Sequence, residues 1–401
     1  MSELSYLENL LNGVEVKWLA LENAAELKRG KRLVRSQLEL EGEFAVYQNS
    51  MTPLGYYHQH NTNPDTTFVI CAGAAGEIGY SSSPFWAADD VYYVASTNLL
   101  NSKFLYHYLL TQKNKISSQV RKASIPRLSK TSLDRIFVPI PCPNIPEKSL
   151  AIQAEIVRIL DKFTALTAEL TAELTAELSI RKKQYNHYRD LLLSFEEGEV
   201  EWKTLGEMGT LIRGKRFVKA DIIPKGVPCI HYGEMYTHYS IWANRAKSYI
   251  SVELASKLRK ASCGDVVFVS AGETIADIGR GTAWLGDEDV VIHDACFFYK
   301  SSLNPKYVAY FSRTNFFHDQ IKKSISSGKI SAINAKGFEK VIIPVPSPEE
   351  QARIVAFLDK FDTLTSSITE GLPREIELRQ KQYEYYRDLL FSFPKPETAS
   401  N

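Results

Sequence analysis

Apolar residues recur at spacings of three and four along two long stretches of the chain, and this pattern predicts two long helices. In the first stretch, residues 151–195, the series is Ile156, Ile159, Leu160, Phe163, Leu166, Leu170, Leu174 and Leu178. Neither glycine nor proline interrupts the stretch, and Thr167–Leu178 repeats Thr-Ala-Glu-Leu three times, a sequence rich in helix formers. A helix of this length with one narrow apolar stripe is typical of a coiled-coil spacer and needs a partner helix.

The second stretch, residues 350–393, is a near copy of the first. QAEIVRILDKFTALT and QARIVAFLDKFDTLT share ten of fifteen positions, and IRKKQYNHYRDLLLSF and LRQKQYEYYRDLLFSF share eleven of sixteen. Gln153 corresponds to Gln351 and Ile180 to Leu378, so both blocks are offset by 198 residues. The two helices are therefore expected to pair through Leu160, Phe163, Leu166, Leu170, Leu174, Leu178, Leu358, Phe361 and Leu364. Gly371-Leu372-Pro373 interrupts the second copy and predicts a kink or break there.

The regions that precede the two helices are also related to each other, although they have diverged much further. Arg29-Gly-Lys-Arg32 recurs as Arg213-Gly-Lys-Arg216, and Val138-Pro-Ile-Pro141 as Ile343-Pro-Val-Pro346, in the same order. Short β-like runs at residues 68–71, 91–94, 266–269 and 295–299 alternate with helical patterns at 103–110 and 306–317. We therefore predict an α/β fold class: two globular α/β domains and a pair of long, pairing helices, in a duplicated arrangement. The expected boundaries are 1–146 and 198–347 for the globular domains, and 147–197 and 348–397 for the helices.

Composition describes an ordinary globular chain. Its 401 residues suit two or three domains, with 44% hydrophobic and 24% charged residues and a net charge of +1. No run of eighteen apolar residues predicts a membrane span, and the first residues do not resemble a signal peptide. Five scattered cysteines without a CxxC pair indicate a reducing cytoplasm and no zinc site.

The net charge does not indicate nucleic-acid binding, but local clusters of basic residues do. Thr111–Lys130 and Gln320–Lys336 are basic without an acidic residue, and a second basic cluster occurs at corresponding places near the start of each globular region. Such clusters, interleaved with Ser, Asn and Gln, suit contact with phosphates, and two nearby polar loops could contact base edges. The candidates for DNA contact are Arg29, Lys31, Arg32, Arg35, Gln48, Asn49, Lys113, Lys115, Arg121, Lys122, Arg127, Lys130, Arg213, Lys215, Arg216, Lys219, His231, Tyr232, Lys322, Lys323, Lys329 and Lys336. The alternative for the lysines and arginines is an ordinary solvated surface.

No catalytic set is convincing. Neither Asn63-Pro64-Asp65 nor Asn304-Pro305-Lys306 is the Asn/Asp-Pro-Pro-aromatic loop of amino-methyltransferases. The glycine-rich run Gly73–Gly79 lacks the following helix that a nucleotide-binding loop needs, and His58 with His60 is best interpreted as an exposed pair in a polar loop. Two alternatives from other classes remain: an enzyme, as a solitary methyltransferase or nuclease, and a coiled-coil adaptor that binds only proteins.

With LDKF and KQYxxYRDLL in both helical copies, each after a variable region, the whole chain resembles the specificity subunits of type I restriction–modification systems. The tandem Thr-Ala-Glu-Leu run resembles the subfamily usually called type IC. The resemblance implies that each variable region is a target-recognition domain and that the chain reads a bipartite double-stranded DNA site with an unspecified gap. It also implies two methyltransferase subunits and further restriction subunits as partners, no active site in this chain, and S-adenosylmethionine, ATP and Mg held by those partners.

The same resemblance implies that the long helices form an antiparallel coiled coil with pseudo-twofold symmetry, and it gives them a second role. If the stripe is buried between the helices, their aromatic and apolar flanks stay available to the methyltransferase subunits. These flanking residues are Tyr185, Tyr188, Leu191, Tyr383, Tyr386 and Leu389.

Overall fold

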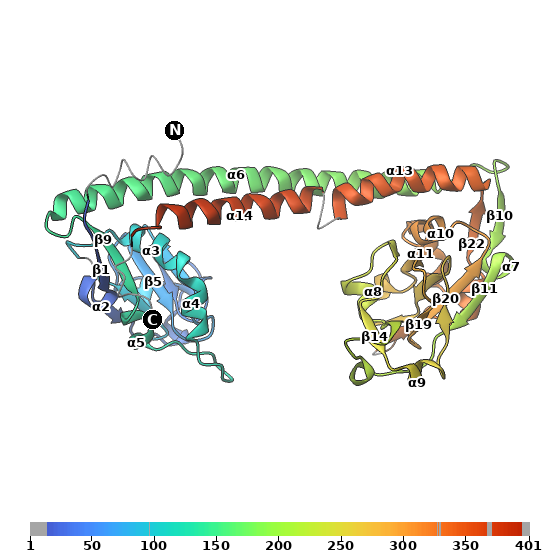
Figure 1. Ribbon diagram of the computed structural model, residues 1–401, viewed down its shortest axis with the longest axis horizontal. Coiled ribbons are helices and arrows are strands. Elements are labelled where there is room, and N and C mark those ends of the chain that lie inside the picture. Colours follow the sequence, from blue (N-terminus) through green and yellow to red (C-terminus); the bar gives the residue numbers. More distant parts are fainter. Residues whose placement is uncertain (1–13, 96, 327, 329, 367–370, 395–401) are drawn as a thin grey trace. The chain divides into compact units, whose positions relative to one another are not determined.

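The computed structural model describes residues 14–95, 97–326, 328, 330–366 and 371–394. The chain forms two compact units (Figure 1). Unit 1 takes the described residues of Met1–Glu173 and Ile376–Asn401, and unit 2 is Leu174–Glu375. The units therefore do not follow the linear order of domain and helix that the sequence predicts, since each combines a globular part with segments of both helical copies.

The globular part of unit 1 is built from short strands in three sheets. The largest has the order β2-β8-β5-β6, with β2 (Leu27–Arg29), β8 (Val91–Val94), β5 (Thr66–Ile70) and β6 (Ile78–Ser81). A second has the order β4-β3-β7, with β4 (Gly55–Tyr57), β3 (Phe44–Tyr47) and β7 (Trp86–Ala87), and β1 (Val16–Ala20) pairs with β9 (Phe137–Pro141). The helices are α2 (Leu21–Ala24), η1 (Arg35–Gln37), α3 (Ser102–Thr111), α4 (Lys113–Ser118) and α5 (Lys130–Asp134).

Unit 2 contains a larger version of the same arrangement. A five-stranded sheet has the order β11-β20-β16-β18-β13, with β11 (Gly209–Arg213), β20 (Cys296–Ser301), β16 (Val266–Val269), β18 (Gly281–Trp284) and β13 (Trp242–Ala243). A four-stranded sheet has the order β14-β12-β19-β15, with β14 (Ser248–Ile250), β12 (Val227–Ile230), β19 (Val290–Ile292) and β15 (Lys260–Ala261). Two further pairs join β10 (Glu201–Thr204) to β22 (Ile342–Val345) and β17 (Ala271–Gly272) to β21 (Ser331–Ala332).

The helices of unit 2 lie between and after these strands. They are α7 (Leu205–Met208), η2 (Lys219–Asp221), α8 (Glu234–Thr237), α9 (Val252–Ala255), η3 (Ile275–Asp277), α10 (Pro305–Phe311), α11 (Asn315–Lys322) and α12 (Ala335–Glu339). The single helix predicted over residues 306–317 is wrong in extent. It ends at Phe311 and a second helix begins at Asn315, because the Thr314 side chain accepts a hydrogen bond from the Phe317 amide and caps a new helix.

The first long helix is α6 (Pro146–Leu192), a continuous helix of 47 residues (Figure 1). Its start is buried in the core of unit 1, where Leu160 is fully enclosed. Leu166, predicted to lie on the apolar stripe, is 51% exposed, whereas Thr167 one position later is half-buried. Leu170, Leu174 and Leu178 are half-buried, so the departure is confined to Leu166, which a 3.6-residue turn places at the edge of the stripe.

The second copy is broken, as its glycine and proline predict. Helix α13 (Pro348–Ser366) ends before Gly371, and α14 (Leu372–Leu390) begins after it. Gly371 has φ +83°, and a Cβ atom there would lie 2.6 Å from the Thr363 carbonyl oxygen. A left-handed glycine between the helices and a proline in the first turn of the second together stop the helix and restart it.

Within each unit the two helical copies run antiparallel. In unit 1 the Phe163 ring stacks on Tyr386 at 5.5 Å between centroids, while Thr164 donates a hydrogen bond to the Tyr383 hydroxyl at 3.1 Å. Since 163 pairs with 386 and 164 with 383, the sequence numbers run in opposite directions. In unit 2 the Tyr188 ring contacts Phe361 at 5.9 Å. The predicted fold class of two α/β domains with paired long helices is confirmed.

The segment after α14 packs into unit 1. Phe391 and Phe393 are buried beside Phe104, and the Trp18 indole donates a hydrogen bond to the Pro394 carbonyl at 2.8 Å. In unit 2 the residue that follows α6, Leu193, is likewise buried in the core together with Leu358. The repeated Leu-Leu-x-Ser-Phe ends of the two helical copies therefore contribute core residues to the globular parts.

Candidate DNA interface

The Arg-Gly-Lys-Arg motif of unit 1 follows strand β2 at the edge of the largest sheet. The Arg29 Nε donates to the Asp89 carbonyl oxygen at 2.8 Å, and the Lys31 amide donates to the Ala87 carbonyl at 2.9 Å. A Cβ atom on Gly30 would lie 2.0 Å from the Ala88 carbonyl oxygen, so only glycine allows this close approach. Arg29 thus partly fixes the loop after β7, while Lys31, Arg32 and the following Arg35 offer their charge to solvent, since all three are exposed.

Unit 2 repeats these contacts. The Arg213 Nε donates to the Asp294 carbonyl oxygen at 2.8 Å, and the Lys215 amide donates to the Ile292 carbonyl at 3.1 Å. A Cβ atom on Gly214 would lie 2.3 Å from the His293 carbonyl oxygen. The recurrence of the motif therefore has a structural cause in its arginine and glycine, and the exposed Arg216 and Lys219 are left as the cations available to a ligand.

The two polar loops predicted to contact bases occupy equivalent positions. In unit 1 the Ala88 amide donates to the carbonyl of Tyr47, the last residue of β3, and in unit 2 the His293 amide donates to the carbonyl of Ile230, the last residue of β12. Gln48 and Asn49 therefore correspond to His231 and Tyr232. Backbone hydrogen bonds, rather than similar side chains, establish this correspondence.

In unit 2 this position carries a cluster of aromatic rings. The His231 ring lies 4.6 Å from His293 and 4.7 Å from Tyr232, and the Phe217 ring lies 5.1 Å from His293. Burial lowers the pKa of both His231 and His293 from the ordinary histidine value. Both rings are thus favoured in the neutral form, which can donate and accept hydrogen bonds at once, while the Tyr232 ring is 38% exposed beside them.

A short hairpin follows helix α4 in unit 1 and carries Arg121, Lys122 and Arg127. The Arg121 amide donates to the Arg127 carbonyl at 2.8 Å, and the Arg127 amide donates back to Arg121 at 3.1 Å. Figure 1 shows a loop that projects from the body of the unit beyond α4 and α5. All three basic residues are exposed. This hairpin, residues 121–127, is called the tip hairpin of unit 1 below.

The equivalent hairpin of unit 2 is closed by Ser326 and Ala332. The Ser326 amide donates to the Ala332 carbonyl at 2.9 Å, and the Ala332 amide donates back at 3.1 Å. Lys329, which the sequence places at its turn, lies outside the described residues. Lys322 and Lys323 precede the hairpin, Lys336 follows it, and all three are exposed.

Hydrogen bonds join these separate segments into one edge of unit 1. The Cys71 amide donates to the Asp90 carbonyl, next to the residue that binds Arg29, and the Cys71 carbonyl accepts from the Leu128 amide just after the tip hairpin. The Ala74 amide donates to the Asn49 carbonyl at 2.9 Å. In unit 2, Ser270 makes the equivalent bonds to Ala295 and Ile333. The motif, the polar loop and the tip hairpin therefore meet at the same edge in both units.

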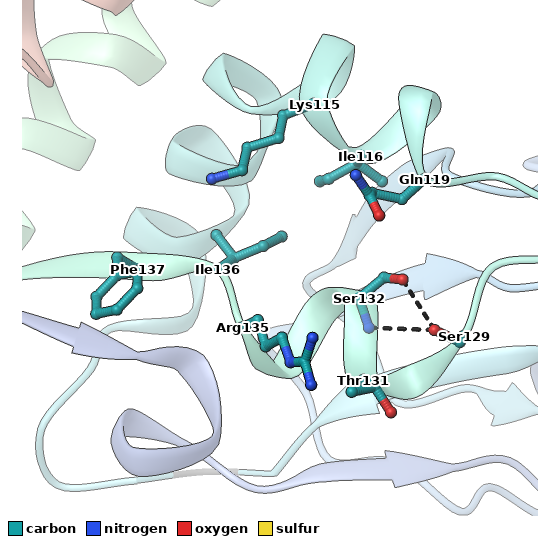
Figure 2. A pocket seen from close by; sticks show the side chains of 9 residues that line it. All are labelled: Lys115, Ile116, Gln119, Ser129, Thr131, Ser132, Arg135, Ile136 and Phe137. Atoms are coloured by element: carbon teal, nitrogen blue, oxygen red, sulfur yellow. Dashed lines mark hydrogen bonds between the residues drawn. The ribbon is translucent and has the colours of Figure 1, made fainter. Parts of the chain in front are cut away.

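Three lysines predicted for DNA contact have other surroundings. Lys113 forms an ion pair with Glu77 at 2.8 Å and Lys130 with Asp134 at 3.7 Å. Figure 2 shows Lys115 on one wall of a pocket of about 410 Å³, across from Arg135 and Ser132. The ion pairs reduce the positive charge that Lys113 and Lys130 can offer to a phosphate, so the exposed cations of the motif and the tip hairpin are the better candidates.

The Asp of LDKF in each helical copy has a role that the sequence did not predict. Asp359 in α13 accepts from Lys306 Nζ at 2.7 Å and from the Tyr310 hydroxyl at 2.7 Å, both on α10. Asp161 in α6 binds Lys103 at 2.7 Å and the buried His107 at 3.3 Å, both on α3. The motif therefore fastens each globular part to its own long helix. The one signal for this contact in the sequence was the basic residue at the same distance after Asn101 and Asn304.

The residues predicted to stay available to methyltransferase subunits divide into two groups. Tyr383 and Tyr386 are half-buried against Thr164 and Phe163, and Tyr185 is half-buried against the core of unit 2, so the paired helix or the core covers part of each side chain. The availability of these three residues to methyltransferase subunits stays a prediction. Tyr188 is 40% exposed and Leu191 is 55% exposed, while Leu389 is half-buried. Tyr188 and Leu191 remain as predicted surface residues.

The described residues also bear on the enzymatic alternatives. Among them no group of three His, Cys, Asp or Glu side chains is arranged to hold a metal ion. Gly73–Gly79 forms the turn of the β5–β6 hairpin and the start of β6 rather than the entrance to a helix, and His58 and His60 bind separate partners, Glu39 and the Thr62 carbonyl. No helix in the described part of the chain has the length and apolar character of a membrane span.

Comparison with known proteins identifies the family. The model of the type I restriction modification DNA specificity domain matches residues 14–179 and 197–378. Over its full length, the chain is 39% identical to the whole specificity subunit of the type I restriction enzyme EcoR124I/EcoR124II of Escherichia coli. It is 35% identical to a putative type I restriction enzyme specificity subunit of Haemophilus influenzae, over 97% of this chain and 98% of the relative.

A solved structure from a study of the assembly and conformational transition of the type I R-M system is similar in fold. Its TM-score is 0.65 at 16% identity, and the match covers 94% of this chain and 97% of that one. Together with the family model, this fold defines a DNA specificity protein of the type I restriction class. The chain belongs to the type I restriction–modification specificity subunit family. The model of the family's domain matches it twice.

Proposed function

We propose that this chain reads a bipartite, asymmetric double-stranded DNA sequence with an unspecified gap, and that it directs the methylation and restriction activities of partner subunits to that sequence. Residues 1–146 and 198–347 act as the two target-recognition domains, and residues 147–197 and 348–397 as the helices that set their spacing. The observation that carries the proposal is the equivalent edge in both units, where the Arg-Gly-Lys-Arg motif, a polar loop and a basic hairpin are joined by the same hydrogen bonds.

At this edge we assign separate tasks to the two kinds of residue. The exposed cations Arg32, Arg35 and Lys122, with Arg216 and Lys219 in unit 2, contact phosphates and fix the register of each unit on the duplex. Gln48 and Asn49 in unit 1, and the cluster around His231 and Tyr232 in unit 2, contact base edges. Because the two loops carry different side chains at equivalent positions, the two half-sites differ in sequence.

The same proposal assigns the chemistry to partners. Two methyltransferase subunits dock on the helices at the exposed residues Tyr188 and Leu191 and their surroundings, and restriction subunits join that core. S-adenosylmethionine, ATP and Mg belong to these subunits, and this chain supplies specificity. The assembly works in the cytoplasm, where it meets DNA.

The experiment uses the chain assembled with its methyltransferase subunits. The double variant Arg32→Gln, Arg35→Gln lowers DNA affinity, and the plot of log K against log salt becomes less steep by about 0.9 for each phosphate that the variant no longer neutralises. The preferred sequence stays the same, since phosphate contacts position the protein and base contacts specify the sequence. Lys148→Gln, which removes a charge of the same sign from an exposed position on the first turn of α6, is the matched control and leaves affinity and slope unchanged.

Two results separate the alternatives. Salt-independent or absent DNA binding by the intact assembly favours the protein-only adaptor. Methyl transfer from S-adenosylmethionine by the purified chain without partners favours a solitary enzyme and contradicts the assignment of the chemistry to other subunits.

A further inference from the structure

The two tip hairpins share one residue that neither phosphate contact nor core packing explains. Ile125 in unit 1 is 54% exposed and Ile330 in unit 2 is 63% exposed. Each lies two residues before the closing residue of its hairpin, Arg127 and Ala332 respectively. The hairpin sequences otherwise differ, Arg-Lys-Ala-Ser-Ile-Pro-Arg against Ser-Ser-Gly-Lys-Ile-Ser-Ala. A single exposed isoleucine needs no explanation, but its recurrence at the same register in two diverged domains does.

Each hairpin is firmly held at its base. Leu128 and Ile333, the residues that follow the closing pair, are 3% and 4% exposed, and their amides donate to the Cys71 and Ser270 carbonyls at 2.9 Å. In unit 1 the hairpin thus projects from a buried attachment, and Ile125 is presented on a short, hydrogen-bonded loop rather than on a free chain end.

The charge around Ile125 fits one kind of partner. No acidic residue occurs between positions 111 and 133 or between 320 and 338 in the sequence, while Arg121, Lys122 and Arg127 flank Ile125. An apolar side chain beside several cations, on the edge that also carries the polar loop, suits nucleic acid, because the cations contact the backbone while the apolar group reaches the bases. Proteins that enter a DNA groove use Ile, Leu, Phe, Met or Pro side chains to unstack a base step.

We propose that Ile125 and Ile330 are apolar wedges, one in each recognition domain, that insert against the bases of their own half-site and partly open one base step. In unit 1 the following Pro126 stiffens the wedge by fixing its backbone. The wedges add shape and deformability to the readout, since a step that unstacks easily costs less to open. This inference rests on the proposed function, because it requires that the edge with the tip hairpins contacts DNA.

The test uses the complete assembly with methyltransferase subunits and duplexes in which 2-aminopurine replaces single adenines of the mapped half-sites. The wild-type assembly raises 2-aminopurine fluorescence at one step in each half-site. Ile125→Ala abolishes the rise in the half-site read by unit 1 only, and Ile330→Ala in the other only. Each variant binds about tenfold more weakly, since roughly three carbon atoms of a half-exposed side chain no longer leave water on binding.

Two further variants make the result decisive. Leu40→Ala removes an apolar side chain that is 96% exposed, beside Glu39 and Glu41, and changes neither fluorescence nor affinity. Lys122→Gln weakens binding and lowers the salt slope but keeps the fluorescence rise. Unchanged fluorescence in both isoleucine variants, with Lys122→Gln still weakened, overturns the wedges and leaves the DNA edge standing. If Lys122→Gln also binds normally, the proposed edge itself is contradicted. If Ile125→Ala instead loses methyltransferase subunits on gel filtration without DNA, the isoleucine belongs to a protein interface and the wedge is overturned.

Discussion

Replacing Asp359 by alanine should loosen the attachment of the second globular domain to its helix. The carboxylate accepts hydrogen bonds from Lys306 and from Tyr310. The Tyr310 side chain is fully buried. Burial, reinforced by Asp359, raises the pKa of Tyr310, so the hydroxyl stays protonated and donates at all accessible pH values. Removing the carboxylate leaves this hydroxyl without an acceptor, which costs about 1–3 kcal/mol.

The ion pair with Lys306 adds less. The Lys306 side chain is 19% exposed and Asp359 is 32% exposed, so solvent screens part of the attraction and the loss is up to about 1 kcal/mol. The expected total for Asp359→Ala is therefore about 1–4 kcal/mol. Asp359→Asn keeps an acceptor for Tyr310 and should cost about 1 kcal/mol.

The twin contact in unit 1 predicts an asymmetry. Asp161 binds Lys103 in the same way, but its second partner is His107 at the longer distance of 3.3 Å. Asp161→Ala should therefore destabilise its unit by less, about 1–2 kcal/mol. Thermal unfolding of the assembled complex measures both, at about 2–4 °C per kcal/mol for a unit of this size. Lys360→Ala, at an exposed position next to Asp359, is the control and should leave the transition in place.

If Asp359→Asn unfolds as easily as Asp359→Ala, the Tyr310 hydrogen bond carries none of the effect and this explanation of the attachment is refuted. Equal shifts for Asp161→Ala and Asp359→Ala would contradict the difference drawn between the two units.

Two other predictions concern the spacer helix and the histidines. Deleting Thr175–Leu178 removes one Thr-Ala-Glu-Leu repeat from α6, which shortens the helix by about 6 Å and rotates the residues beyond the deletion by roughly 40°. Methylation-site mapping should then show that the unspecified gap is about one base pair shorter and that both half-sites are unchanged. An unchanged gap at full activity would contradict the spacer role of this run. Burial lowers the pKa of His107, His231, His293 and His318 below the ordinary value. The unfolded chain then binds more protons than the folded chain below about pH 6.5, so the stability of the fold should decrease as the pH drops through that value and stay level above it. Thermal unfolding at about pH 5.5 and 7.5 measures this difference. Equal transition temperatures at the two pH values would count against it.

Much of the architecture was predictable because it repeats. A long run of helix-forming residues without glycine or proline predicted α6, and Gly371-Leu372-Pro373 predicted the break between α13 and α14. Leu166 was misplaced because a spacing pattern does not state which edge of an apolar stripe a partner helix covers. The division into units was missed, since the packing of Phe391 and Phe393 beside Phe104 joins residues far apart in the sequence.

The candidate interface was predictable only in part, for a related reason. Composition identified the basic segments. The sequence could not, however, distinguish basic residues that are exposed to solvent from those that form an ion pair with a carboxylate, as Lys113 does with Glu77. The equivalence of Gln48 with His231 depends on one backbone hydrogen bond in each unit and has no counterpart in side-chain similarity. The attachment role of Asp161 and Asp359 was likewise hidden, because a charged residue on a helix usually faces solvent.

The most direct test of independent half-site recognition maps methylated sites after residues 20–135 are replaced by the equivalent segment of a relative with a different target. The chimaera is expressed with the methyltransferase subunits, and modified positions are read across the genome. Because the recognition edge of unit 1 is built from residues within this segment, we expect one half-site to change to that of the relative, while the gap and the other half-site stay the same. A chimaera that methylates actively and changes both half-sites, or neither, would contradict independent reading by the two units.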